Sequence, residues 1–109
     1  MEIWSSIDSP AVLSEFASRL NQLRMTPYEK LKALSDFVND TVPIDDQAVQ
    51  FTTYRNSTEN DDIEIVLQVS IQSRKRMGLS FAQVSADGFR ISPNGEIQTL
   101  PKEALYDYT

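Results

Sequence analysis

One run of alternating side chains constrains the fold of this chain more than any other feature. Apolar residues occupy every second position from Ile63 to Ile71, and the positions between them are mostly polar. Successive side chains of a strand point to opposite faces of the sheet, so this run predicts a strand with one buried face. A single buried face is typical of an antiparallel sheet. Other parts of the chain must therefore cover that face.

Further strands are expected on both sides of this run. The stretch 48–55 is rich in β-branched and aromatic residues, with alternate apolar positions, and residues 56–62 form a polar break after it. The run Arg74 to Gly78 is expected to turn the chain. Asp87-Gly88 and Pro93-Asn94-Gly95 indicate two more turns, the first of them a tight hairpin. The expected strands are residues 48–55, 63–71, 79–86, 89–91 and 96–100.

Two amphipathic helices are expected before the strands. Ser9-Pro10 is a strong helix start, because serine caps the first turn and proline fits the first helical position. The sequence Thr26-Pro27-Tyr28-Glu29 fits a capping box and predicts a second helix, which must fade between Asn39 and Val42 because Pro43 follows. The apolar positions assigned to these helices are Val12, Leu13, Phe16, Ala17, Leu20, Leu23, Tyr28, Leu31, Leu34 and Val38.

These elements predict an α+β fold for residues 1–109 as a single domain. The helix pair is the only large apolar surface available to cover the sheet, so we expect two layers: a pair of N-terminal helices and a four- to five-stranded antiparallel β-meander. The tail after Pro101 is expected to form a brief helix or to cap the core. A curled sheet around a helix, as in cystatin-like or NTF2-like cones, is one arrangement that this order allows, and this analogy of fold implies no function.

The composition argues against common catalytic chemistry. The chain contains neither histidine nor cysteine, so imidazole bases, thiol nucleophiles, disulfides and zinc sites built on nitrogen or sulfur cannot form. The acidic stretch Glu59 to Asp62 lacks the glycine of an EF-hand loop and is interpreted as a solvated hairpin loop. Asp45-Asp46 is interpreted as a turn or strand entry. We therefore expect no enzyme activity, no cofactor and no metal.

The charge bears on location and partners. The chain has ten basic and sixteen acidic residues, which gives a formal net charge of −6. A negative net charge opposes binding to nucleic acid or to an anionic membrane. The start of the chain does not resemble a signal peptide, and no apolar run is long enough to span a membrane. These features predict a soluble, cytoplasmic protein.

Six residues are candidates for contact with a partner. Arg74, Lys75 and Arg76 form the one basic cluster that opposes the overall charge, and such clusters bind phosphates, nucleic acid or acidic surfaces. Trp4, Tyr106 and Tyr108 lie near the ends of the chain, where aromatic side chains either bind a partner or attach a terminus to its own core.

Four hypotheses for function follow. The first is a small non-enzymatic interaction or regulatory module (adaptor, inhibitor or immunity-type) that binds another protein or forms a homodimer. The second is a small-molecule-binding domain with a pocket between a curved sheet and the helices. The third is an enzyme of a cone-shaped fold, an isomerase or hydrolase, that uses carboxylates and tyrosines, which requires a deep cleft holding an Asp or Glu. The fourth is nucleic-acid binding through Arg74-Lys75-Arg76, which the net charge opposes.

Overall fold

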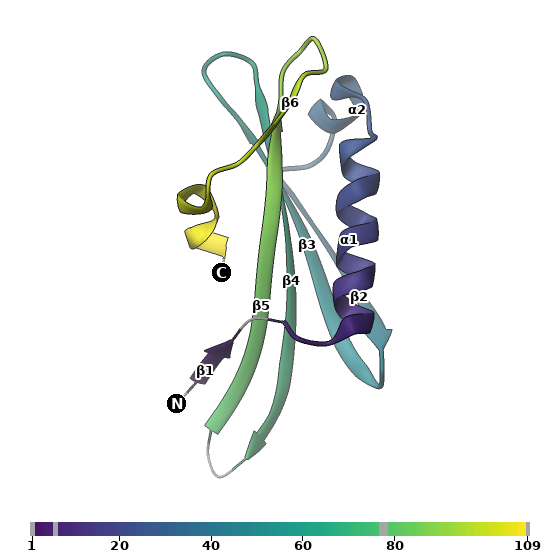
Figure 1. Cartoon of the computed structure of the whole chain (residues 1–109), viewed down its shortest axis with the longest axis vertical. Helices are drawn as coiled ribbons and strands as arrows, with labels where there is room; N and C mark the ends of the chain where they lie inside the picture. The colour runs from purple at the N-terminus through teal and green to yellow at the C-terminus, as the bar shows by residue number, and fades with distance from the viewer. Residues whose placement is uncertain (1, 6, 77–78, 109) are drawn as a thin grey trace.

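The computed structural model describes the backbone of residues 2–5, 7–76 and 79–108, and the side chains of residues 7–71, 82–106 and 108. It confirms the α+β class: helices pack on a long antiparallel sheet to which a short parallel strand is added (Figure 1). The elements in chain order are β1 (Glu2–Ser5), α1 (Pro10–Arg24), α2 (Tyr28–Lys32), β2 (Phe37–Ile44), β3 (Gln47–Ser57), β4 (Ile63–Arg76), β5 (Leu79–Ile91), β6 (Ile97–Thr99) and the 3₁₀-helix η1 (Lys102–Tyr108).

The sheet is a meander with one addition. Strands β2 to β6 pair antiparallel with their neighbours in sequence, and β1 pairs parallel with the free side of β5. The strand order is β1-β5-β4-β3-β2, and β6 pairs with the opposite end of β5 from β1. Strand β2 is therefore an edge strand. The molecule is elongated, 51 Å in its longest dimension, and the β4–β5 end projects beyond α1 (Figure 1).

The first helix begins as predicted. The Ser9 hydroxyl accepts a hydrogen bond from the Val12 amide, and Pro10 occupies the first turn. Val12 and Leu20 are buried against the apolar face of β4, whose alternating residues form the centre of the core. Leu13 is an exception, since 40% of its surface is exposed. The core that results is Ile7, Val12, Leu20, Tyr28, Leu31, Val49, Phe51, Ile63, Ile65, Leu67, Val69, Ile71, Phe89 and Ile91.

The second helix is much shorter than predicted. It ends at Lys32, and residues 37–44 form strand β2 instead. The capping box is absent: Pro27 precedes the helix without a side-chain cap, and the Thr26 hydroxyl donates to the Gln22 carbonyl of α1. Asp45 and Asp46 both adopt positive φ, as a tight hairpin turn requires. This turn brings residues 37–44 against β3, with which they pair along their whole length. This long-range pairing overrides the local helical pattern.

The turn predicted at Asp87-Gly88 is also wrong. Both residues lie inside β5, which runs without interruption from Leu79 to Ile91. Gly88 is buried opposite Val66, and a Cβ atom built there would lie 2.1 Å from the Ile65 carbonyl oxygen. The glycine therefore permits a close approach between two strands.

The predictions for the remaining turns and for the C-terminal tail are confirmed in some places and wrong in others. The turn at 93–95 is confirmed, with Gly95 at φ +88°, and the tail forms η1. The chain does reverse within the run Arg74 to Gly78, because Arg76 of β4 pairs with Leu79 of β5. The loop predicted at Arg74 to Arg76 is wrong, because these three residues continue β4. Met77 and Gly78 lie outside the described residues. The parallel strand β1 has no counterpart in the sequence expectations.

The two faces of the sheet differ. The helices cover the face that carries the odd-numbered residues of β4, from Ile63 to Ile71. The opposite face, called the open face below, carries Val66, Gln68 and Ser70. The segment η1 packs on part of it, since Tyr108 contacts Gln68 and Tyr54 there.

Candidate functional site

The outer edge of β2 exposes unpaired backbone groups. In an antiparallel pair, alternate residues direct both their N–H and C=O groups toward the neighbouring strand. The Arg55 amide donates to the Asp36 carbonyl at 2.9 Å, so residues 36, 38, 40, 42 and 44 face β3. Phe37, Asn39, Thr41 and Pro43 therefore direct their backbone groups outward. No residue in the described part of the chain pairs with this edge.

Proline limits this edge at one end. Pro43 lacks an N–H, so the outward donors are those of Phe37, Asn39 and Thr41. Free edges favour uncontrolled pairing with other chains, and a proline near a strand end shortens the stretch that can pair. The pairing stretch that remains is residues 37–41.

A groove lies on the open face beside this edge. Its cavity volume is about 310 Å³. Alternate residues of three neighbouring strands line it, because side chains of alternate residues share one face of a sheet. The lining residues are Phe37 and Asn39 of β2, Gln50, Thr52 and Tyr54 of β3, and Gln68 and Ser70 of β4.

Two hydrogen-bond networks fix the groove side chains. In the first, the Asn39 Oδ1 accepts from the Thr52 hydroxyl at 2.6 Å and from the Gln50 amide at 3.1 Å. Thr52 is buried, so this bond satisfies the one hydroxyl that the groove hides from water. The network also joins β2 to β3 through side chains.

The second network joins the groove to the C-terminal segment. The Tyr54 hydroxyl donates to the Gln68 Oε1, and the Gln68 amide donates to the Tyr108 carbonyl. The Tyr108 ring packs on Tyr54 at 4.9 Å between centroids, and its hydroxyl accepts from Asn56. Segment η1 thereby holds one end of the groove in place.

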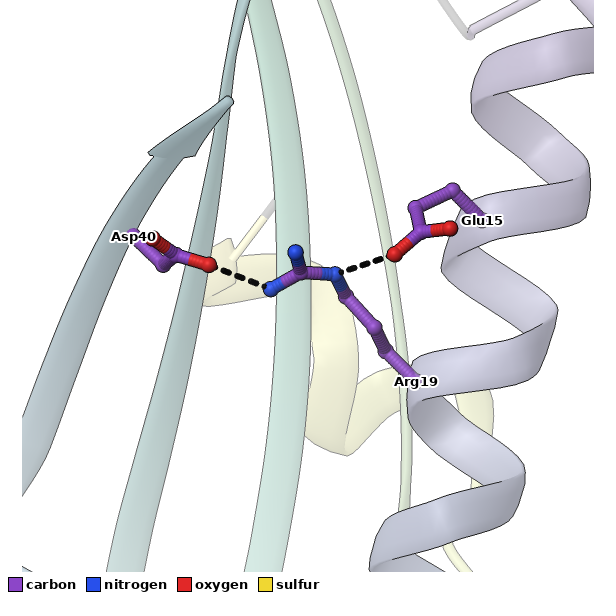
Figure 2. A network of polar contacts seen from close by, with 3 residues as sticks. All are labelled: Glu15, Arg19 and Asp40. Carbon is purple, nitrogen blue, oxygen red and sulfur yellow. Dashed lines mark hydrogen bonds and ion pairs between the residues drawn. The ribbon is translucent and has the colours of Figure 1, made fainter. Parts of the chain in front are cut away.

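An ion-pair network attaches β2 to the helix layer (Figure 2). Arg19 of α1 donates to the Asp40 carboxylate at 2.8 Å and to the Glu15 carboxylate at 2.9 Å. Its guanidinium also lies over the Phe51 ring, 4.3 Å from the centroid. Burial lowers the pKa of Arg19, but the hydrogen bonds and charges of Asp40 and Glu15 outweigh burial and raise the pKa above its ordinary value. Arg19 is therefore a fixed positive charge.

A second, smaller cavity lies between α1 and β3. Its volume is about 260 Å³, and its lining residues are Arg19, Gln22, Leu23, Thr26 and Thr53. It lies where a pocket was expected between sheet and helices, but its one charged group already binds two carboxylates. The groove on the open face, by contrast, has no charged side chain in its lining.

Comparison with known protein families, curated proteins and solved structures finds no match to this chain. Within the described ranges, no three acidic side chains gather closely enough to hold a metal ion. No helix in the described part of the chain combines the length and apolar character needed to cross a membrane.

The backbone places the six sequence candidates in two groups: Trp4 of β1 and Arg74 to Arg76 of β4 flank the same end of β5, and Tyr106 and Tyr108 lie in η1. Arg74, Lys75 and Arg76 lie at the end of β4, and Trp4 pairs through its backbone with Ala82; these four side chains lie outside those described. Tyr106 is 67% exposed. Tyr108 contacts the groove residues Tyr54 and Gln68.

Sequence reasoning missed the groove and the edge for different reasons. The polar positions of β3 and β4, such as Gln50 and Gln68, follow the predicted alternation, but the pattern alone marks them only as the solvent side. The edge was missed because residues 37–42 were assigned to the second helix. Residues 37–44 do not alternate regularly between apolar and polar, so the signal that was available is their content of β-branched residues: Val38, Thr41, Val42 and Ile44.

Proposed function

We propose that this protein is a non-enzymatic interaction module that binds an extended segment of another protein as an added strand along β2. The observation that carries the proposal is the row of outward N–H and C=O groups at Phe37, Asn39 and Thr41. Strand addition to a free sheet edge uses such groups for affinity and the adjacent side chains for specificity. The absence of histidine and cysteine supports a role without catalysis.

The edge is already formed before a partner binds. Strand β2 pairs with β3 along all eight of its residues. Asn39 binds two side chains of β3, and Asp40 binds Arg19 of α1. A strand held in place loses little conformational freedom on binding, so more of the interaction energy appears as affinity.

The charge of the edge favours a basic partner. Between Lys32 and Arg55 the chain has no lysine or arginine, and it has four aspartates: Asp36, Asp40, Asp45 and Asp46. Arg55 and Arg19 each neutralise one of these, which leaves the hairpin tip at Asp45-Asp46 unpaired among the described residues. Opposite charge raises association rates and selects partners. We therefore expect the added segment to carry lysine or arginine.

A second copy of the chain is the alternative occupant. Two β2 strands could pair antiparallel about Asn39, with Phe37 of one copy opposite Thr41 of the other. This register uses all three outward N–H groups. The net charge of −6 on each copy opposes it, which is why we favour a basic segment of another protein.

The test uses a synthetic peptide of eight residues, the length of β2, in which lysine and valine alternate. A peptide of alternating glutamate and valine is the control for charge. In ¹H–¹⁵N NMR spectra, we expect the lysine peptide to shift the amides of Phe37, Asn39 and Thr41 and to slow their hydrogen exchange. Affinity should fall as salt is added, because charge attraction is screened.

The matched variants are Thr41→Pro and Thr41→Val. Proline removes one outward N–H without touching the bonds to β3, whereas valine keeps that N–H. Thr41→Pro should abolish binding of the lysine peptide, and Thr41→Val should retain it. Equal binding by both variants, or no response at residues 37–41, would overturn the proposal. A wild-type dimer in sedimentation equilibrium that Thr41→Pro converts to monomer would show that the second copy is the occupant.

A further inference from the structure

We infer that the groove on the open face binds a neutral saccharide, a function separate from strand addition at β2. The inference rests on the uncharged lining, on the hydrogen-bonding groups that remain without a partner, and on two aromatic rings that border them.

The lining carries no charge. Of the 109 residues of the chain, 26 are charged, yet all seven side chains around the groove are neutral. The solvent side of a sheet commonly carries charged residues, which also limit unwanted association. Anionic ligands would find no cation in this lining, and cationic ligands would find no carboxylate. The matching ligand is therefore neutral.

The groove offers donors and acceptors side by side. Asn39 uses its Oδ1 for Thr52 and Gln50, which leaves its amide N–H groups available. Gln50 keeps its side-chain carbonyl oxygen available, and the Ser70 hydroxyl makes no hydrogen bond among the described residues. A sugar hydroxyl both donates and accepts, so it complements such a mixed set better than a ligand with donors or acceptors alone.

The groups are held in position. Each of the two networks described above fixes the orientation of its side chains before any ligand arrives. Gln68, for example, uses its oxygen for Tyr54 and its nitrogen for Tyr108. Fixed polar groups discriminate well between ligands, because a ligand that lacks the matching hydroxyl leaves them unpaired.

Two aromatic rings give the groove an apolar side. Phe37 is 57% exposed, and its ring stacks near Tyr54 at 6.4 Å between centroids with an interplanar angle of 27°. An aromatic face is electron-rich and attracts weakly positive C–H groups. One face of a pyranose ring presents C–H groups while its rim presents hydroxyls, which matches this combination of rings and amides.

The volume agrees with a ligand of this size. A cavity of about 310 Å³ lies at the lower end of the range typical of small-molecule sites. The groove lies on the surface of the sheet, so a longer oligosaccharide can extend beyond it. We therefore expect one or two sugar units to make the specific contacts.

The experiment titrates the ¹⁵N-labelled protein with defined neutral sugars: glucose, galactose, mannose, N-acetylglucosamine, cellotriose and maltotriose. The side-chain amide resonances of Asn39, Gln50 and Gln68 report directly on the groove. At least one sugar should shift them in a saturable way. Glucuronic acid, tested beside glucose, should bind no more tightly, because the lining offers no cation.

Two groove variants and one control complete the test. Phe37→Ala and Gln50→Ala change exposed side chains, so both are expected to fold, and each should weaken binding about tenfold. Asn21→Ala changes an exposed amide on α1, away from the groove, and should leave affinity unchanged. No saturable shift with any of the six sugars, or equal affinity in all three variants, would overturn the inference.

The failure of this inference is distinguishable from that of the proposed function. Thr41 does not line the groove, so Thr41→Pro should bind the sugar as the wild type does while losing the lysine peptide. If the lysine peptide instead shifts the Asn39 and Gln50 side chains and no sugar does so, the groove belongs to the peptide site and the saccharide inference is wrong.

Discussion

Arg19 of α1 donates a hydrogen bond to the carboxylate of Asp40 in β2 across 2.8 Å, which ties the helix layer to the edge of the sheet. The edge strand otherwise depends on β3 alone for its backbone bonds. The guanidinium also rests on Phe51 of β3. One side chain thus contacts both strands at the edge proposed for partner binding.

We predict that the Arg19–Asp40 pair is worth about 0.5–1 kcal/mol of unfolding free energy, because both groups are partly exposed. A double-mutant cycle with Arg19→Ala and Asp40→Ala measures this coupling by chemical denaturation. Arg19→Ala alone should cost more than Asp40→Ala, since it also removes the contact with Phe51. Equal losses in the two single variants would contradict this account.

The stability contributed by Arg19 should not vary with pH near neutrality. The folded state raises the pKa of Arg19. Such a cation contributes its full stabilisation of the fold at pH values below its unfolded-state pKa, and this stabilisation is lost only as the pH rises through the folded-state pKa. For Arg19 this window lies far above neutral pH, and the chain has no histidine. The unfolding free energy of wild type minus that of Arg19→Ala should therefore be constant from about pH 6 to pH 9. A slope in this difference over that range would contradict the prediction.

The second helix is a case in which a sequence pattern predicted the wrong secondary structure. Residues 28–38 carry apolar side chains at helical spacing, yet Phe37 and Val38 belong to a strand. The deciding residues are Asp45 and Asp46, whose turn pairs residues 37–44 with a strand already specified by its own alternation. Local periodicity cannot report this competition, because the energy comes from contacts made across the turn.

The outward and inward residues of β2 should respond differently to proline. Val42→Pro removes an N–H that bonds to β3 and should lower the unfolding free energy by about 3 kcal/mol. Thr41→Pro removes an outward N–H and should cost less than half as much. Thermal denaturation of both variants checks the difference. Similar losses would mean that the alternation of backbone bonds along β2 has been assigned the wrong way round.

The tail should stabilise the groove as well as the fold. Tyr108→Ala removes the ring contact with Tyr54 and the acceptor for Asn56, and should cost about 1–2 kcal/mol. Tyr108→Phe removes only the exposed bond to Asn56 and should cost well under 1 kcal/mol. Denaturation compares the two, and NMR should show broader Gln68 amide signals in the alanine variant. Unchanged Gln68 amide signals in Tyr108→Ala would show that the Tyr108 side chain does not hold the groove side chains in place.

The Asp87-Gly88 dipeptide is a second case, because it predicted a hairpin turn and lies inside strand β5. The dipeptide is a strong hairpin signal, but a glycine also occurs where two backbones approach closely. Nothing in a single sequence separates these two uses, because the approach depends on Ile65 and Val66, more than twenty residues away. The alternation in β4 and the cap at Ser9 were predictable because their signals are local.

Substitution of Gly88 and substitution of Gly95 should therefore lower the stability of the fold for different physical reasons. Gly88→Ala places a Cβ atom 2.1 Å from the Ile65 carbonyl oxygen, so strands β4 and β5 must separate, and we expect a loss of at least about 2 kcal/mol. Gly95 has φ +88° and open space around it, so Gly95→Ala should lose about 1 kcal/mol from backbone strain. Gly95→Asn should recover part of that loss, because asparagine tolerates positive φ, whereas Gly88→Asn should be worse than Gly88→Ala. Chemical denaturation of the four variants separates crowding from backbone strain, and a Gly88→Ala protein as stable as the wild type would refute the close approach of β4 and β5.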